Sequence, residues 1–168
     1  RATREQLRFL ATHDSLTELL NRRELVTRIS GVLAQTPRTG IHVGVLFIDL
    51  DGLKSVNDTY GHAVGDEVIV TVARRVRDRV RVNDVLARFG GDEFVLVLPA
   101  IHGVDDVARI CEELHRAVTQ PMAVGERTIV MTMSVGVAVV SPGEDPDSAL
   151  RRADAALHFF VVIDRFGG

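Results

Sequence analysis

Two pairs of acidic residues stand beside apolar runs of the sequence, in places where a plain strand or turn needs no charge. Asp49 and Asp51 close a long apolar run, and Asp92 and Glu93 lie between a pair of glycines and a second apolar run. Residues two apart in a strand face the same side, so Asp49 and Asp51 are expected to project together. Crowded carboxylates repel each other and lose hydration, and a divalent cation offsets both costs. The two pairs favour a metal site over the simpler interpretation, in which each only begins a polar loop or turn.

The residues that follow Asp51 suit an anionic ligand. Gly52 lacks a side chain, so backbone N–H groups can approach an anion there. Lys54 is the only lysine among 20 basic residues, and its position favours a phosphate contact over simple exposure to solvent. The amide of Asn57 and the carboxylate of Asp66 suit the edge of a guanine base, although a helix cap and a turn residue are equally good interpretations of them. Metal, phosphate and base together indicate nucleotide-dependent phosphoryl transfer, for which Mg²⁺ is the usual ion.

The composition indicates one ordinary globular domain, since 168 residues, of which 46% are hydrophobic, suffice for a sizeable core. A net charge of -3 argues against general nucleic-acid binding, which needs a basic surplus. The single cysteine, Cys111, excludes an internal disulfide, suits a reducing cytoplasm, and lies at a helical spacing that favours a buried structural thiol. No signal peptide is present, and no apolar run reaches the roughly 20 residues of a membrane span. Because the chain starts at Arg1, we expect a longer parent protein, whose anchoring to a membrane stays open.

The apolar pattern predicts helices and strands that position these residues. A nearly continuous apolar run before Asp49 is typical of a central strand buried on both faces. Asn21 is an expected N-cap, with Glu24 completing a capping box, and a short turn is expected at Gly125. Helices are predicted in 4–14, 21–35, 61–80, 105–118 and 145–160, and strands in 41–51, 84–89, 93–98 and 127–140, the second and third strands forming a hairpin. After the lead-in helix, the order α-β-α-β-β-α-β-α indicates an α/β (α+β) sandwich whose central, mostly antiparallel sheet is flanked by helices.

Five segments, in order and at matching spacing, resemble the signatures of the GGDEF family of bacterial diguanylate cyclases. They are "HDSLTELLNRR", with Glu18 where glycine is usual, "DLDGLKSVNDTYGHAVGD", with Leu53 where phenylalanine is common, the unchanged "RFGGDEF", "MTMSVGVA" and "ADAAL". The resemblance runs from Asp14 to Leu157. It implies a fold like the palm of adenylyl cyclases and polymerases, with residues 13–168 as the GGDEF domain and residues 1–12 as the end of a connecting helix.

The resemblance also assigns roles to individual residues. Magnesium, or manganese in its place, would be held by Asp49, the backbone carbonyl of Leu50, and Asp92, while Asp92 and Glu93 would form the catalytic pair. A larger set would bind the substrate, by holding the triphosphate, reading guanine and giving the nucleotide clearance over the turn. These residues are Gly52, Leu53, Lys54, Asn57, Asp66, Gly90, Gly91 and Arg165.

The implied reaction joins two GTP molecules held by two facing domains. Each 3′-hydroxyl attacks the α-phosphate of the other GTP, which releases two pyrophosphates and cyclic di-GMP. A homodimer is therefore part of the implied chemistry, and upstream sensory or other domains of the parent protein would control it. "RVND", from Arg81 to Asp84, has the RxxD form of the family's inhibitory product site, against the simpler interpretation of a solvated helix end.

The last segment of the chain departs from the family pattern. His158 stands where tyrosine is usual, Val161 where a triphosphate-binding lysine is usual, and Asp164 where glycine is usual, while Arg165 remains in step. Loss of one charge-assisted contact costs about 1.5–3 kcal/mol. A non-catalytic module that binds GTP or cyclic di-GMP therefore stays as the alternative to an active cyclase. A nucleic-acid polymerase palm is disfavoured by the acidic net charge.

Overall fold

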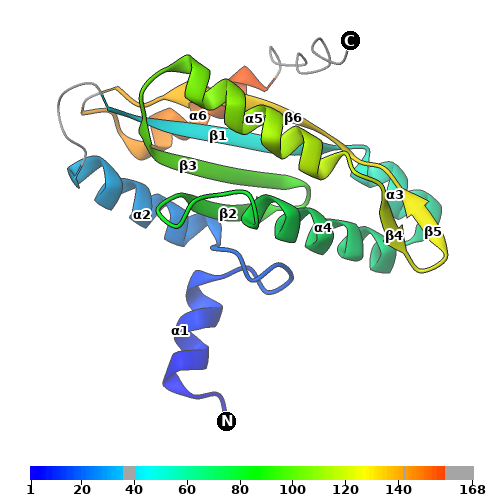
Figure 1. The fold of residues 1–168 in the computed structure, drawn as a ribbon. Coiled ribbons are helices and arrows are strands. Elements are labelled where there is room, and N and C mark those ends of the chain that lie inside the picture. Colours follow the sequence, from blue (N-terminus) through cyan, green and yellow to red (C-terminus); the bar gives the residue numbers. More distant parts are fainter. Residues whose placement is uncertain (36–40, 142, 158–168) are drawn as a thin grey trace.

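The computed structural model describes residues 1–35, 41–141 and 143–157 (Figure 1). The helices within these residues are α1 Arg4–Thr12, α2 Arg22–Gln35, α3 Leu53–Tyr60, α4 His62–Arg77, α5 Val104–Val118 and α6 Pro146–Ala156. The strands are β1 His42–Asp51, β2 Val85–Gly90, β3 Glu93–Ile101, β4 Met122–Val124, β5 Arg127–Ile129 and β6 Thr132–Val139.

A four-stranded antiparallel sheet with strand order β2-β3-β1-β6 forms the middle of the molecule. Residues 43–48 of β1 are all buried, which confirms the prediction of a central strand covered on both faces. β2 and β3 form the predicted hairpin, and β4 and β5 form a separate two-stranded hairpin with its turn at Gly125. The predicted fold class, a mostly antiparallel sheet flanked by helices, is confirmed.

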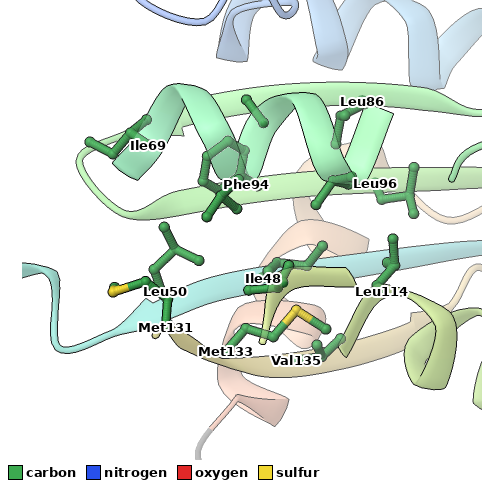
Figure 2. Close-up of a cluster of buried hydrophobic side chains, with 14 of the residues drawn as sticks. Ile48, Leu50, Ile69, Leu86, Phe94, Leu96, Leu114, Met131, Met133 and Val135 are labelled. Carbon is green, nitrogen blue, oxygen red and sulfur yellow. The ribbon is translucent and has the colours of Figure 1, made fainter. Parts of the chain in front are cut away.

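Side chains at alternate positions of the sheet strands pack into two separate hydrophobic cores, one on each face. Ile48 and Leu50 of β1 belong to the core that α4 and α5 cover (Figure 2). Phe47 belongs to the opposite core, which α2 and α6 cover. Because side chains alternate along a strand, Asp49 continues the series of Phe47. The acidic end of β1 therefore lies on the side of the sheet that α2 and α6 cover.

Helix α6 lies very close to β6. A Cβ atom added at Gly136 of β6 would lie 2.0 Å from the carbonyl oxygen of Ala153 in α6. Only a residue without a side chain permits this contact. Pro146 occupies the first turn of α6, as predicted, because the missing N–H of proline costs nothing there.

Two predicted elements are divided in the structure. The sequence pattern predicts one helix between β1 and β2, but the structure has α3 and α4, which meet at Gly61. Gly61 adopts φ 91°, a conformation that favours glycine and ends α3. The strand predicted in 127–140 is divided into β5 and β6, because its first part pairs with β4 and its second part pairs with β1.

The helix caps differ in part from the prediction. Asn21 caps α2, since its Oδ1 accepts a hydrogen bond from the N–H of Glu24 over 2.9 Å. A capping box also requires a bond from the Asn21 N–H to the Glu24 carboxylate, and this part of the prediction is wrong. The Glu24 carboxylate pairs with Arg28, and the Asn21 N–H donates to the carbonyl of Thr12. A complete capping box occurs instead between Thr3 and Gln6, at the start of α1.

Two predictions from composition can be compared with the structure. Cys111 is buried in α5, and burial raises the pKa of its thiol to about 11, in agreement with a structural thiol. Among the helices of residues 1–35, 41–141 and 143–157, none has the length and apolar character needed to cross a membrane.

Candidate active site

The ends of β1 and β3 bring the two acidic pairs together. Asp49 lies directly opposite Glu93, and the backbone N–H of Leu50 donates to the carbonyl oxygen of Asp92 over 3.0 Å. The N–H and C=O groups of one strand residue point toward the same neighbouring strand, so the carbonyl of Leu50 also faces the side of Asp92. Two carboxylates and one backbone carbonyl, from Asp49, Asp92 and Leu50, are thus neighbours.

Asp49 is the carboxylate most affected by burial and by the neighbouring negative charges. Its Oδ1 atom is buried and has no hydrogen-bond partner among the described residues. Burial raises the pKa of Asp49 to about 7, with further contributions from the hydrogen bond and charge of Asp92 and the charges of Glu93 and Asp51. A buried polar atom without a partner is rare and costly, and a bound cation would satisfy it. The donor set of carboxylate and carbonyl oxygens fits Mg²⁺.

The described residues contain no cluster of three or more His, Cys, Asp or Glu side chains arranged to hold a metal ion. A site with two carboxylates and one backbone carbonyl is compatible with this finding, because the third ligand is not a side chain. Magnesium commonly takes one or two carboxylates and completes its coordination with water and substrate phosphates.

Asp51 differs from Asp49 in its environment. Its Oδ2 accepts a hydrogen bond from Thr132 Oγ1 over 3.0 Å, and its Oδ1 accepts one from Ser134 Oγ over 2.9 Å. Both hydroxyls come from β6, the neighbour of β1 on the side away from the hairpin. The spacing of the two aspartates predicts that their side chains point the same way and act together. In the structure, Asp51 is hydrogen-bonded to β6, whereas Asp49 interacts with Asp92.

The hairpin turn leaves space on its outer side. Gly90 and Gly91 adopt φ values of 134° and 48°, which favour glycine. A Cβ atom at either position would meet no other atom within 4 Å. The expectation that these glycines leave clearance for a ligand is therefore compatible with the geometry.

The start of α3 carries the residues from which the sequence predicts a phosphate contact. Gly52 is the N-cap residue with φ 83°, Leu53 is buried, and Lys54 is exposed. The first N–H groups of a helix have no partner within the helix and carry a partial positive charge, so they attract anions. These groups follow Asp49 and Asp51 directly in the chain.

Asn57 and Asp66 lie on the two helices that meet at Gly61. The N–H of Gly61 donates to the carbonyl of Asn57 over 2.8 Å, and the N–H of Gly65 donates to the carbonyl of Gly61 over 3.2 Å. A Cβ atom at Gly65 would lie only 1.7 Å from Asn57 Oδ1, so the amide packs against the residue that precedes Asp66. The structure therefore places the predicted base-reading residues in one small region.

A family model described as "Diguanylate cyclase, GGDEF domain" matches residues 11–159 of the chain. The chain belongs to the GGDEF family. Its sequence is 40% identical over 159 residues to the bifunctional diguanylate cyclase/cyclic di-GMP phosphodiesterase MucR of Pseudomonas aeruginosa, an alignment that covers 94% of this chain and 23% of MucR. The chain spans between 23% and 34% of the length of the curated relatives it matches.

Solved GGDEF domains have the same fold. A structure comprising only the GGDEF domain of TpbB from Pseudomonas aeruginosa has a TM-score of 0.82 at 35% identity, covering 88% of this chain and 87% of that chain. The GGDEF domain of DgcB from Caulobacter crescentus, in complex with c-di-GMP, has a TM-score of 0.81 at 32% identity, covering 94% and 92%.

The RxxD segment of this GGDEF domain forms a tight turn just before β2. The N–H of Arg81 donates to Asp84 Oδ2 over 2.7 Å, and the N–H of Asp84 donates to the carbonyl of Arg81 over 3.1 Å. Burial raises the pKa of Asp84, although the hydrogen bond and charge of Arg81 act in the opposite direction. Arg81 is exposed, and a cavity of about 500 Å³ has Asp84 in its wall. The turn thus combines the exposed Arg81 with an aspartate that borders the cavity.

Glu93 borders a second cavity, of about 380 Å³, on the side of the sheet that α2 and α6 cover. Arg22 of α2 and Asp154 of α6 lie in its wall. Burial raises the pKa of Glu93, the charges of Asp154 and Asp92 raise it further, and the charge of Arg22 lowers it. The sequence gives no signal for these neighbours, because α2 and α6 reach Glu93 only through the tertiary fold.

The sequence also gives no signal for an ion pair behind the turn. Arg88 Nη1 donates to both carboxylate oxygens of Asp14 over 3.1 Å, across 74 positions of the chain. Burial alone would raise the pKa of Asp14, but hydrogen bonds from Thr17 and Arg88 lower it overall. Arg165, assigned to the triphosphate by resemblance, lies outside the described residues, as do His158, Val161 and Asp164.

Proposed function

We propose that this GGDEF domain is an active diguanylate cyclase that condenses two GTP molecules into cyclic di-GMP. Residues 13–168 form the catalytic domain, and residues 1–12 are the end of a helix that connects it to upstream domains of a longer cytoplasmic or membrane-anchored parent. The observation that carries the proposal is the buried, unpartnered Oδ1 of Asp49 beside Asp92. A buried carboxylate oxygen without a partner is rare in folded proteins, and strongly shifted pKa values gather at functional sites, so this arrangement supports a functional site at Asp49.

GGDEF diguanylate cyclases are metal-dependent. Asp49, Asp92 and the carbonyl of Leu50 would hold Mg²⁺, with Mn²⁺ as the alternative ion. When bound, the ion would neutralise charge on the phosphates and favour ionisation of the attacking hydroxyl. Glu93 supports this site as the cross-strand partner of Asp49.

The other residues orient the nucleotide. The N–H groups at Gly52 and Leu53 and the ammonium of Lys54 bind the triphosphate. The amide of Asn57 donates to and accepts from the edge of guanine, and the carboxylate of Asp66 accepts from its N–H groups. The open turn at Gly90 and Gly91 gives room for the nucleotide. Arg165 is proposed as a further contact to the triphosphate.

The reaction needs two copies of the domain. Each holds one GTP, and the 3′-hydroxyl of each GTP loses its proton to solvent as its oxygen bonds to the α-phosphorus of the other, while pyrophosphate leaves with the electrons of the broken P–O bond. One domain supplies only half of the reacting atoms, so a homodimer is the active form. Arg81 and Asp84 bind the product and restrain the two domains from meeting.

The test is to incubate the domain at high concentration with GTP and Mg²⁺ and to measure cyclic di-GMP. We expect product from the wild type and at least about 100-fold less from Asp92→Asn, because one of the two carboxylates proposed to hold the metal ion loses its charge. Asp105→Asn, which changes an exposed aspartate at the start of α5, is the matched control and should keep full activity. A wild type that binds GTP or cyclic di-GMP without forming product would support the non-catalytic module instead.

A further inference from the structure

The turn before Asp92 is held by one arginine from behind. Arg88 donates from Nε and Nη2 to the carbonyl oxygen of Gly91, over 3.2 and 3.0 Å. The Arg88 side chain is only 12% exposed, whereas Gly91, the acceptor of both bonds, is exposed. The bonds fix the direction of the Gly91 carbonyl and, because a peptide group is planar, the plane of the Gly91–Asp92 peptide.

The peptide on the other side of Asp92 is fixed as well. The carbonyl oxygen of Asp92 accepts the hydrogen bond from Leu50. A residue has only two soft backbone dihedrals, and they are set by the planes of the two peptides that flank it. Arg88 and Leu50 together therefore fix the backbone of Asp92, and with it the direction in which its side chain leaves the turn beside Asp49.

The same guanidinium reaches the segment that follows α1. Its Nη1 donates to both oxygens of Asp14, whose carboxylate also accepts from the N–H and Oγ1 of Thr17 over 2.9 and 2.7 Å. The N–H of Arg88 also donates to the carbonyl of Leu20, so both ends of the segment of residues 14–20 are bonded to Arg88 of β2.

Helix α1 precedes the segment of residues 14–20 and is not part of it. It projects away from the sheet and has no buried residue (Figure 1). Its last residue, Thr12, is followed directly by His13 and Asp14. The end of α1 is joined to the domain at two places, through the Asp14 segment and through Asn21, which donates to the carbonyls of Ala11 and Thr12. A displacement of α1 therefore reaches the Asp14 segment as well as the start of α2.

We propose that Arg88 is a positioning residue that couples the end of α1 to the catalytic turn. Asp14 holds the guanidinium, the guanidinium holds the Gly91 carbonyl, and that peptide sets the orientation of Asp92. The position of α1 thus adjusts the metal-binding geometry without any contact between α1 and the site. This coupling of rate to α1 rests on the proposed cyclase function, while the mechanical link from Asp14 to the turn does not.

Two variants break the link at different points. Arg88→Lys keeps the charge but replaces the planar fork with an ammonium that cannot serve Asp14 and Gly91 in the same way. Asp14→Asn leaves Arg88 intact and removes the negative charge that holds it. Arg75→Lys is the matched control, since Arg75 is a part-buried arginine that donates to backbone carbonyls at the end of α5, away from the turn.

For both link variants we expect kcat to fall about 10- to 100-fold, because a small displacement of a catalytic group has that effect. The KM for GTP should change by less than about threefold, since the contacts to guanine and triphosphate come from other elements. Arg75→Lys should lower stability and leave kcat unchanged. If both link variants lose no more kcat than Arg75→Lys, the ion pair only stabilises the fold and the proposal is wrong.

Hydrogen exchange tests the mechanical link without activity. In Asp14→Asn, the amides of residues 89–93 should exchange about tenfold faster than in the wild type, and in Arg75→Lys they should not. A wild type without turnover would overturn the proposed function alone, and exchange at the turn would still decide the coupling. Unchanged exchange in Asp14→Asn would overturn the coupling even in an active cyclase.

Discussion

Asp49 of β1 and Glu93 of β3 are direct partners across the two central strands, on the side of the sheet that α2 and α6 cover. Asp92 precedes Glu93, so three carboxylates gather at one end of the strand pair. The negative charges of Asp92 and Glu93 disfavour ionisation of the Asp49 carboxyl, and so does its burial. The folded domain therefore binds a proton at Asp49 more tightly than the unfolded chain does.

This predicts a pH-dependent stability for the metal-free domain. The pKa of Asp49 is raised from 3.8 to about 7 on folding, first by burial and then by Asp92. Its favourable contribution is fully present below the unfolded pKa and is lost as pH rises toward 7. With a chelator present, the free energy of unfolding should fall by on the order of 2 kcal/mol across this range, after allowance for solvent screening.

Asp49→Asn removes the titrating group and should remove this slope. Urea denaturation with chelator at several pH values measures it, and the variant should be more stable than the wild type above pH 7. Asp51→Asn is the matched control in the same strand, and it should give no gain because it weakens bonds to Thr132 and Ser134. An equal slope in wild type and Asp49→Asn would contradict the assignment of the raised pKa to Asp49.

Metal addition should reverse this destabilisation. An ion that binds only the folded state stabilises it by about 2.7 kcal/mol at 100 times its dissociation constant. The melting temperature of the wild type should therefore rise with Mg²⁺, and much less so in Asp92→Asn or Asp49→Asn. Asp105→Asn should respond as the wild type does, and NaCl at equal ionic strength controls for screening. A similar rise in all variants would place the ion elsewhere.

The sequence predicts the parts of the site that follow from local pattern. The apolar run of β1 and the glycine pair of the hairpin are strong local signals, and strand alternation places Asp49 at the end of a buried strand. The convergence of Asp49 and Asp92 is expected only if the hairpin lies beside β1, and the antiparallel pairing of β1 with β3 supplies this condition, because β3 begins where β1 ends. The polar stretch that forms α3 carries no long apolar stripe, so the pattern does not reveal a helix there.

Hydrogen bonds between residues that are far apart in the sequence cannot be predicted from local pattern. Thr132 and Ser134 bind Asp51 across 81 and 83 positions, and Arg88 binds Asp14 across 74. Hydroxyls on a strand and an arginine beside a turn are common, so their residue types single out no partner. These bonds decide which aspartate is left for a cation, which is why spacing alone treats Asp49 and Asp51 alike.

Gly65→Ala should separate guanine binding from stability. The new Cβ would lie 1.7 Å from Asn57 Oδ1, and the end of the asparagine side chain must move away. Such a movement costs the fold little, but it would withdraw the hydrogen bond that Asn57 is proposed to make with guanine. We expect the dissociation constant for GTP, measured by calorimetry, to rise about 5- to 10-fold, with unfolding free energy changed by less than about 1 kcal/mol.

Gly31→Ala is the control for this substitution. Gly31 lies within α2, and a Cβ there would meet no other atom within 4 Å. Alanine should stabilise the helix by about 0.5–1 kcal/mol and leave GTP binding unchanged. Equal GTP affinity in Gly65→Ala and wild type would show that Asn57 does not read the nucleotide.

Arg81→Ala should relieve inhibition by the product. The exposed guanidinium of Arg81 beside the cavity at Asp84 suits bidentate contacts with a phosphate or a base edge. Loss of such a contact costs about 1.5–3 kcal/mol, so the concentration of cyclic di-GMP that halves the rate should rise at least about tenfold. The uninhibited rate should stay as in the wild type, because the RxxD turn and the catalytic turn lie at opposite ends of β2. Arg79→Ala, which removes a nearby exposed arginine, should leave inhibition unchanged, and unchanged inhibition in Arg81→Ala would refute the product site.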